Sequence, residues 1–310
     1  MNTRQKLEII KENLGLTQTK LAEKLGVSFV AFNNWWNEKS TPRAKSRAAI
    51  DRLLLEVTGQ KSIPANQLSA KKEALVKRSK KHASIISEIL NSPDIRDEFI
   101  LALTYHSNRI EGSTLTEPET AAILFNNAAW PNRTLTEQLE AKNHQTALLY
   151  LFDWMNNRRQ ISQELVLRLH GMLMNGVHPE AGQYRRQAVR IVGTNLPTAN
   201  YLKIPELMPE IMADARKKTS DIINLAADIH SRFEQVHPFA DGNGRVGRLL
   251  MNAMLLKENL PPAVIRQENK RWYYNFLYQA QTKADSSSLE DFLCDAVLDG
   301  FKILERINLN

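Results

Sequence analysis

Apolar residues recur at steps of three and four positions along most of the chain, the spacing that places them on one face of an α-helix. Beyond about residue 95 almost every periodic segment has this helical period, most clearly at residues 99–110, 222–236 and 246–258. We therefore expect an all-α fold. A length of 310 residues, of which 43% are hydrophobic, leaves room for a large core and two domains.

The N-terminal residues predict two short helices joined by a tight turn. The first helix would end at Gly26 and the second would be capped by Ser28. A polar stretch with both glycine and proline at residues 58–66 then predicts a linker. We expect a first domain over residues 1–57, a basic linker and connecting helix over residues 58–94, and a second domain over residues 95–310.

The segment from His237 to Arg248 gathers groups that can hold a polyphosphate. Gly242 and Gly244 lack a Cβ atom, so their amides can approach an anion closely and form an anion nest. The helix that follows would direct its N-terminal dipole toward that anion. Arg245 and Arg248 lie one helical turn apart, and both can bond to phosphate oxygens.

Two further groups in this segment can act on a bound nucleotide. Asp241 is the one protein ligand that the sequence offers for Mg²⁺, which would neutralise charge on a departing diphosphate. His237 titrates near neutrality and could take a proton from an attacking hydroxyl. A plain helix-to-helix turn with a capping Asp or Asn is the simpler alternative. It explains the glycines, but not why His, Asp and two Arg converge.

These residues resemble the motif of the Fic family, HxFx(D/E)GNGRxxR, and every specified position is matched. The resemblance implies transfer of AMP from ATP to a Ser, Thr or Tyr hydroxyl of a target protein, with release of pyrophosphate. It implies that His237 is the general base, that Asp241 holds Mg²⁺, and that Asn243 and the glycine amides hold the α- and β-phosphates. It assigns the outer phosphates to the two arginines. A phosphorylating relative carries Lys at the position of Gly244, so glycine here favours AMP transfer.

Ser107 and Glu111 stand four residues apart at the end of a helix expected near residues 97–112, which Gly112 would terminate. This fragment resembles the family's inhibitory motif, (S/T)xxxE(G/N), in the position typical of the subclass with an N-terminal inhibitory helix. The resemblance implies that Glu111 pairs with Arg248 and turns it away from the γ-phosphate. In some family members the same Glu orients a water that removes AMP. An ordinary helix end is the structural alternative.

Two flanking stretches also resemble family segments. The short β-hairpin flap that would pair with the main chain of a target corresponds to Ile191, Val192 and Gly193. The residues expected to line an adenine pocket are Tyr274 and Leu277, while Gln281 stands where the family has Asn. Core packing is the alternative for the aromatic residues of this last stretch, and for Tyr273 it is the favoured one.

The two N-terminal helices resemble a helix-turn-helix of the Cro/repressor type, whose second helix enters the major groove. The residues that would reach bases or backbone are Gln18, Ser28, Phe29, Asn33, Asn34, Arg43 and Lys45. Trp36 and Glu38 depart from the family pattern, and such helices can instead dock a protein. Residues 1–90 hold 17 of the 41 Lys and Arg and 8 of the 34 Asp and Glu, an excess that suits nucleic acid or a solvated basic face.

The remaining features limit compartment and partners. No apolar run has the length of a bilayer span, and the N-terminal residues lack the apolar core of a signal peptide. A single cysteine in apolar surroundings, Cys294, indicates a buried thiol in a reducing compartment, so we expect a cytoplasmic protein. The histidines other than His237, among them His170 and His230, show no metal-ligand spacing and are assigned structural or surface roles.

The sequence therefore predicts an all-α, autoinhibited protein adenylyltransferase that uses ATP and Mg²⁺ and acts on a target protein. DNA binding by the N-terminal domain and a homodimer are left open. A DNA-binding regulator whose nucleotide pocket senses ATP without transferring AMP is the alternative function.

Overall fold

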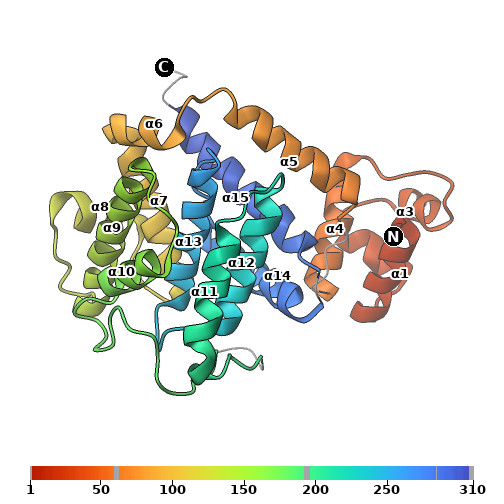
Figure 1. The fold of residues 1–310 in the computed structure, drawn as a ribbon. Helices are drawn as coiled ribbons and strands as arrows, with labels where there is room; N and C mark the ends of the chain where they lie inside the picture. The colour runs from red at the N-terminus through yellow and green to blue at the C-terminus, as the bar shows by residue number, and fades with distance from the viewer. Residues whose placement is uncertain (1, 59–62, 192–195, 284, 307–310) are drawn as a thin grey trace. The chain divides into compact units, whose positions relative to one another are not determined.

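In the computed structural model the chain divides into two units, Met1–Pro64 and Ala65–Asn310. The structure describes residues 2–58, 63–191, 196–283 and 285–306. Across these ranges every regular element is helical and no strand is present, so the all-α prediction is confirmed there (Figure 1). No helix in them combines the length and the apolar character that a bilayer span requires.

The described residues of the first unit form four helices: α1 (Thr3–Leu14), α2 (Gln18–Lys24), α3 (Phe29–Trp36) and α4 (Ala44–Thr58). Its core contains Leu7, Leu21 and Phe32, each 0% exposed. Gly26 has a φ of 67°, and the hydroxyl of Ser28 accepts the backbone N–H of Ala31 at 3.3 Å. The predicted turn and cap between α2 and α3 are therefore confirmed. That the two helices form a DNA-reading motif stays a prediction.

The second unit contains the remaining helices: α5 (Ala65–Ser79), α6 (Ile85–Asn91), α7 (Pro93–Glu111), α8 (Glu117–Asn126), α9 (Leu135–Asn156), α10 (Gln163–Leu173), η1 (Tyr201–Lys203), α11 (Ile204–Ala215), α12 (Ile222–Val236), α13 (Asn243–Lys257), η2 (Gln267–Asn269), α14 (Lys270–Lys283) and α15 (Ser287–Glu305). α13 lies in its middle, with α12 against one side and α7, α9 and α10 against others (Figure 1). Nearly every residue of α13 is buried. Its N-terminus, which begins at the glycine loop, is therefore held from several directions.

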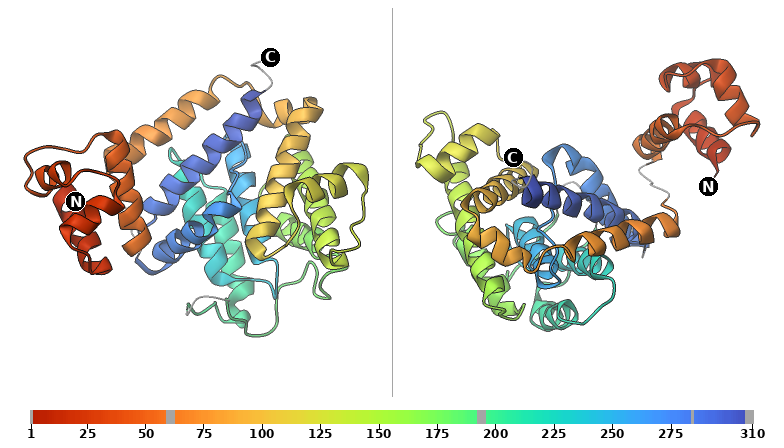
Figure 2. Two further views of the ribbon diagram at one scale, coloured as in Figure 1. Left: turned by 180° about the vertical axis from the view of Figure 1, so that it is seen from behind. Right: turned by 90° about the horizontal axis from the view of Figure 1, so that it is seen from above.

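Helix α5 belongs to the second unit and is not a free connector. It lies along α15 (Figure 2), where Lys71 Nζ binds Asp291 Oδ1 at 2.8 Å and Arg78 Nε binds Glu305 Oε1 at 2.7 Å. Lys72 also pairs with Glu290. The sequence assigned the segment 58–94 to a linker and connecting helix. In the structure, residues 58–64 belong to the first unit and residues 65–94, which include α5, belong to the second.

The segment expected to form the flap is only partly described. No strand occurs in the described residues on either side of it, 186–191 and 196–200. Thr198 Oγ1 donates to the carbonyl of Val189 at 2.9 Å and links the two sides. Ile191 is half-buried, whereas Val192 and Gly193 lie outside the described residues. The β-hairpin therefore stays a prediction.

Candidate active site

His237 lies at the end of α12 in a backbone conformation that residues other than glycine rarely adopt. Its φ is 52° and its ψ is 61°, and its N–H donates to the carbonyl of Phe233 at 2.9 Å. A left-handed residue of this kind costs about 1–3 kcal/mol and persists only where its surroundings hold it. The turn takes the chain directly from α12 into the glycine loop.

The buried guanidinium of Arg185 holds this turn. Arg185 is 2% exposed and donates to the carbonyl oxygens of His237 at 2.7 Å and Val236 at 3.3 Å. It also donates to the carbonyls of Gln187 at 2.7 Å and Ala199 at 2.6 Å. One side chain therefore ties the end of α12 to the chain on both sides of the expected flap.

The imidazole of His237 is arranged to accept a proton. Nδ1 lies 3.2 Å from the carbonyl oxygen of Glu234, which can only accept, so Nδ1 carries the hydrogen and Nε2 is left unprotonated. Burial lowers the pKa of His237, and although the Glu234 carbonyl opposes this, Arg185 adds to the lowering. The ring is therefore neutral near pH 7 and can act as a general base.

The glycine loop is braced from inside by Asn243. Its Oδ1 accepts the backbone N–H of Phe239 at 2.9 Å, and its Nδ2 donates to the carbonyl of the same residue at 2.9 Å. Asn243 is 2% exposed. Its side chain is thus occupied in closing the loop, and the contact with phosphates that the sequence assigned to Asn243 and the glycine amides stays a prediction.

The loop is also supported by His170, from the end of α10. His170 stacks on Phe239 with ring centroids 3.7 Å apart, and its Nε2 donates to the carbonyl of Asp241 at 3.1 Å. Burial lowers its pKa to about 4, so it is neutral. Gly242 has a φ of 77°, and a Cβ there would lie 2.8 Å from Met174 Sδ. Only glycine fits this position, and His170 has a positioning role that its spacing in the sequence did not reveal.

Asp241 is the loop's exposed carboxylate. Its Oδ1 accepts the N–H of Gly242 at 2.6 Å, and its side chain is 60% exposed. In the described part of the chain no group of three or more His, Cys, Asp or Glu side chains could hold a metal ion. Mg²⁺, however, is commonly held by one or two carboxylates together with phosphates and water. An accessible carboxylate beside a loop expected to hold phosphate fits that mode of binding.

Arg245 forms an ion pair with a carboxylate of another helix. Its guanidinium donates to Glu140 Oε1 of α9 at 2.6 Å, and the residue is 3% exposed. Asp241 Oδ2 lies 3.7 Å away. The ion pair with Glu140 fixes the first turn of α13 to α9, and binding of outer phosphates by Arg245 stays a prediction.

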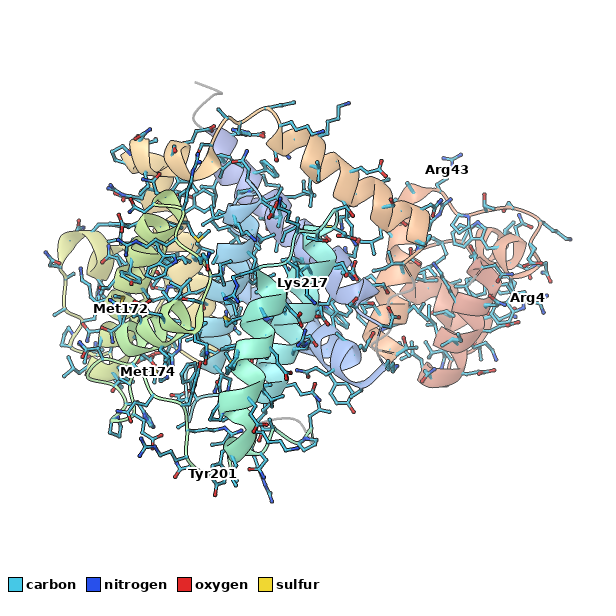
Figure 3. The ribbon with its side chains drawn as sticks, in the orientation of Figure 1. Arg4, Arg43, Met172, Met174, Tyr201 and Lys217 are labelled. Carbon is cyan, nitrogen blue, oxygen red and sulfur yellow. The ribbon has the colours of Figure 1, made fainter. Side chains whose placement is uncertain are left out.

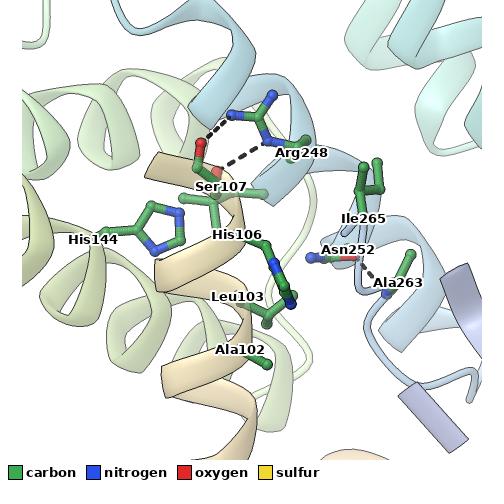
Figure 4. A pocket seen from close by; sticks show the side chains of 10 residues that line it. Ala102, Leu103, His106, Ser107, His144, Arg248, Asn252, Ala263 and Ile265 are labelled. Atoms are coloured by element: carbon green, nitrogen blue, oxygen red, sulfur yellow. Dashed lines mark hydrogen bonds between the residues drawn. The ribbon is translucent and has the colours of Figure 1, made fainter. Parts of the chain in front are cut away.

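Arg248 is bound by the two residues of the expected inhibitory motif. Its Nε donates to Ser107 Oγ at 2.9 Å and its Nη2 to the carbonyl of Ser107 at 3.2 Å, beside a cavity of about 20 Å³ (Figure 4). Nη2 also donates to Glu111 Oε1 at 2.6 Å. Burial is the largest influence and opposes the charge of Arg248, but the Glu111 carboxylate together with Tyr273 and Tyr274 outweighs it and raises the Arg248 pKa. The pairing that the family resemblance implies is present.

The carboxylate of Glu111 also lies against Gly244. A Cβ on Gly244 would collide with Glu111 Oε1 and would lie 3.0 Å from Arg248 Nη1. A larger residue is therefore excluded while the ion pair is present. The sequence marked Gly244 as part of an anion nest, and in this structure the anion beside it is a carboxylate from α7.

The residues expected to contact adenine lie on α14. Tyr274 is 39% exposed, and Lys270 Nζ lies 6.0 Å from its ring centroid. Leu277 is buried beside it on the same helix, and Gln281 Nε2 donates to the carbonyl of Ser231 at 3.0 Å. Tyr274 offers an accessible ring for stacking, whereas the amide of Gln281 is tied to α12.

Behind α13 lies a buried polar group that the sequence did not reveal. Tyr273 and His230, each 1% exposed, share a hydrogen bond of 2.6 Å between the hydroxyl and Nε2. Glu234 lies close by, where a Cβ on Gly247 would be 2.5 Å from its Oε1. Burial raises the pKa of Glu234 to about 8, with Arg248 opposing and Glu111 adding to the shift. Glu234 is thus a neutral acid at pH 7.

The residues expected to contact DNA lie on α2, at the N-cap of α3 and on α3, just before α4 at Arg43, and in the first turn of α4 at Lys45. Arg43 is exposed and extends away from the backbone (Figure 3), and Phe29 is 45% exposed. Asn33 Oδ1 accepts from Asn37 Nδ2 at 2.8 Å, and the Ser28 hydroxyl serves as the cap of α3. Gln18 and Asn34 are half-buried.

Residues 160–255, which include the whole segment from His237 to Arg248, match the sequence model of the Fic/DOC family. The chain is 34% identical over 180 residues to the protein adenylyltransferase Fic of Nematostella vectensis, an alignment that covers 57% of this chain and 42% of that protein. It is 32% identical over 193 residues to the protein adenylyltransferase Fic of Drosophila virilis, covering 62% of this chain and 40% of that protein. The chain thus spans about two fifths of the length of these curated relatives.

Two solved structures share the fold. A fragment of Fic-1 from C. elegans is similar with a TM-score of 0.68 at 22% identity, over 94% of this chain and 85% of that chain. A Fic domain containing signaling protein from Bacteroides thetaiotaomicron is similar with a TM-score of 0.61 at 24% identity, over 78% of this chain and 97% of that chain. At these identities the likeness shows the fold.

The neutral state of Glu234 predicts a pH-dependent stability. Between the ordinary carboxyl pKa of 4.5 and the folded value of about 8, the unfolded chain has lost this proton while the folded chain keeps it. Folding therefore weakens as pH rises through this window. Glu234→Gln keeps the shape of the group without the titration, so its free energy of unfolding should exceed that of the wild type increasingly from pH 4.5 to 8 and then level off. Denaturant unfolding at several pH values measures this, and parallel curves for the two proteins would contradict it.

Proposed function

We propose that this chain is an autoinhibited protein adenylyltransferase of the Fic/DOC family, of the subclass with an N-terminal inhibitory helix. It would transfer AMP from ATP to a Ser, Thr or Tyr hydroxyl of a target protein. The observation that carries the proposal is the unprotonated Nε2 of His237 beside a glycine loop that leads into the N-terminus of the buried helix α13. The match to the Fic/DOC family and the names of the relatives support it.

The chemistry follows from the groups in the site. His237 Nε2 takes the proton of the target hydroxyl while its oxygen attacks the α-phosphorus of ATP. A new oxygen–phosphorus bond forms, the bond from the α-phosphorus to the α,β-bridging oxygen breaks, and pyrophosphate leaves. The amides of the loop and of the first turn of α13 stabilise the phosphate oxygens. Mg²⁺ held by Asp241 would neutralise charge on the leaving group.

The Glu111 carboxylate is proposed to inhibit the enzyme by occupying the place of the outer phosphates of ATP. The Glu111 carboxylate lies against Gly244 and binds Arg248 at 2.6 Å, where the outer phosphates of ATP would require the same space and the same cation. A carboxylate and a phosphate there would also repel each other. ATP could then bind only with its phosphates displaced, and the α-phosphorus would not face His237. Departure of Glu111 frees both the nest and Arg248.

Glu111→Gly should therefore activate AMP transfer. With Mg²⁺ and ATP labelled at the α-phosphate, we expect this variant to label itself and lysate proteins at least about tenfold more than the wild type, because Arg248 becomes available to phosphate. Adding His237→Ala should lower labelling by about 10²- to 10⁴-fold, the usual contribution of a general base. Gel autoradiography and peptide mass spectrometry measure both effects.

Two controls make this result specific. Glu98→Gly removes an α7 carboxylate that pairs with Arg306 outside the site, and it should leave labelling at the wild-type level. ATP labelled at the γ-phosphate should transfer nothing. If Glu111→Gly binds ATP but labels no protein, itself included, the pocket only senses nucleotide and the enzyme proposal is wrong.

A second function, DNA binding by a helix-turn-helix in the first unit, is favoured by the exposed face of α3. Phe29 is 45% and Val30 is 70% exposed there, and the exposed cations Arg43 and Lys45 follow in the chain. Exposed apolar side chains of a recognition helix can contact thymine methyl groups, and the cations can contact phosphates. The same apolar face could instead dock a protein.

DNA binding predicts a salt dependence that one substitution changes. We expect the protein to bind duplex DNA with an affinity that falls linearly with salt on logarithmic axes, and Arg43→Ala to reduce that slope by about 1. Arg4→Ala removes an exposed arginine of α1 and serves as the matched control, with no change of slope expected. Fluorescence anisotropy against salt concentration measures both slopes. Absence of binding at low salt would instead favour the protein-docking alternative.

A further inference from the structure

A groove of about 380 Å³ lies beside the end of α12, between α11 and the chain that follows the expected flap. Its apolar lining comes from residues 197–199, from Leu207 and Ile211 of α11, and from Val236 of α12. Ile211 is 2% and Val236 8% exposed, so the lining is continuous with the hydrophobic core. None of these residues takes part in the proposed nucleotide chemistry.

The polar residues of the groove leave this lining free for an apolar group. Arg232 donates to Asp214 Oδ2 at 2.6 Å, and Asp228 Oδ2 lies 3.4 Å from it, so its charge is compensated. Glu210 and Gln235 are exposed. A charged ligand would therefore gain little free energy by binding at the base of the groove, whereas an apolar side chain would displace water from it.

The groove is joined to the proposed catalytic base by backbone hydrogen bonds. The N–H of Ala199 donates to the carbonyl of Gln235 at 3.3 Å, and the carbonyl of Ala199 accepts from Arg185 at 2.6 Å. The same guanidinium donates to the carbonyl of His237 at 2.7 Å. Val236, which lines the groove, directly precedes His237. The groove therefore lies next to the residue proposed to receive the proton of a target hydroxyl.

We propose that this groove receives one apolar side chain of the target protein, at a fixed distance along the chain from the acceptor hydroxyl, and thereby selects the target. The proposal rests on the AMP transfer proposed above and adds a specificity site to it. A single apolar side chain matches an opening that is apolar inside, polar at its edge and adjacent to the reacting group.

The test is a change of substrate preference. The Glu111→Gly enzyme is given α-labelled ATP, Mg²⁺ and a peptide library with one central Ser, Thr or Tyr and random flanking positions, and modified peptides are sequenced by mass spectrometry. We expect apolar residues to be enriched roughly tenfold at one flanking position. Leu207→Arg in the same background places a cation in the groove and should replace this preference with one for Asp or Glu.

Leu202→Arg is the matched control. Leu202 lies close to Leu207 in the sequence, but it is 69% exposed and outside the groove, so the apolar preference should persist. Self-labelling should be the same in all three proteins, which shows that folding and nucleotide chemistry are intact. The groove proposal is overturned if enrichment is absent, if Leu207→Arg leaves it unchanged, or if self-labelling occurs without any peptide labelling. Loss of self-labelling in Glu111→Gly itself instead identifies failure of the proposed AMP transfer.

Discussion

The ion pair between Glu111 and Arg248 is the interaction on which the rest of the site depends. It joins α7 to α13, and its carboxylate lies against the Cα of Gly244, in the nest that the glycine loop forms for an anion. Arg248 is 5% exposed, and an unpaired charge at such a position would be strongly unfavourable. The pair is therefore both a structural link and the ground for the proposed inhibition. A bound triphosphate offers the same kind of charge to the same guanidinium, so nucleotide and carboxylate are natural competitors.

Around this pair, the other polar side chains of the site mainly form hydrogen bonds to backbone groups and so hold the loop in place. Arg185 fixes the left-handed turn at His237, Asn243 closes the loop onto Phe239, and His170 supports the loop through Asp241. Neutral His170, His230 and Glu234 surround the site without adding charge to it, because burial shifts the pKa of each toward the uncharged form. The charged groups that remain in the site are those near the loop, and Nε2 of His237 carries no proton. Such a rigid frame suits chemistry in which positioning of phosphate and base matters most.

Local signals in the sequence predicted the helices, the glycine loop and the cap residues, because periodicity, glycine and capping act within a few positions of the chain. The ion pair of Glu111 with Arg248 was reached through family resemblance, since the two residues are 137 positions apart. What could not be predicted depends on long-range packing. Arg245 pairs with Glu140 across 105 positions, and Asn243 turns inward to brace the loop. The roles of Arg185 and Glu234 arise only when α12 packs against its neighbours. The hydrophobic periodicity of the sequence does not predict those long-range contacts.

The most direct test of the central claim is a pair of crystal structures, of the wild type and of Glu111→Gly, each with a nonhydrolysable ATP analogue and Mg²⁺. In the variant the account predicts the γ-phosphate on Arg248, the inner phosphates against the amides of the glycine loop, and the α-phosphorus open toward Nε2 of His237. In the wild type the phosphates should be displaced by the Glu111 carboxylate. Identical phosphate positions in the two proteins, or a triphosphate bound away from the loop in the variant, would contradict it.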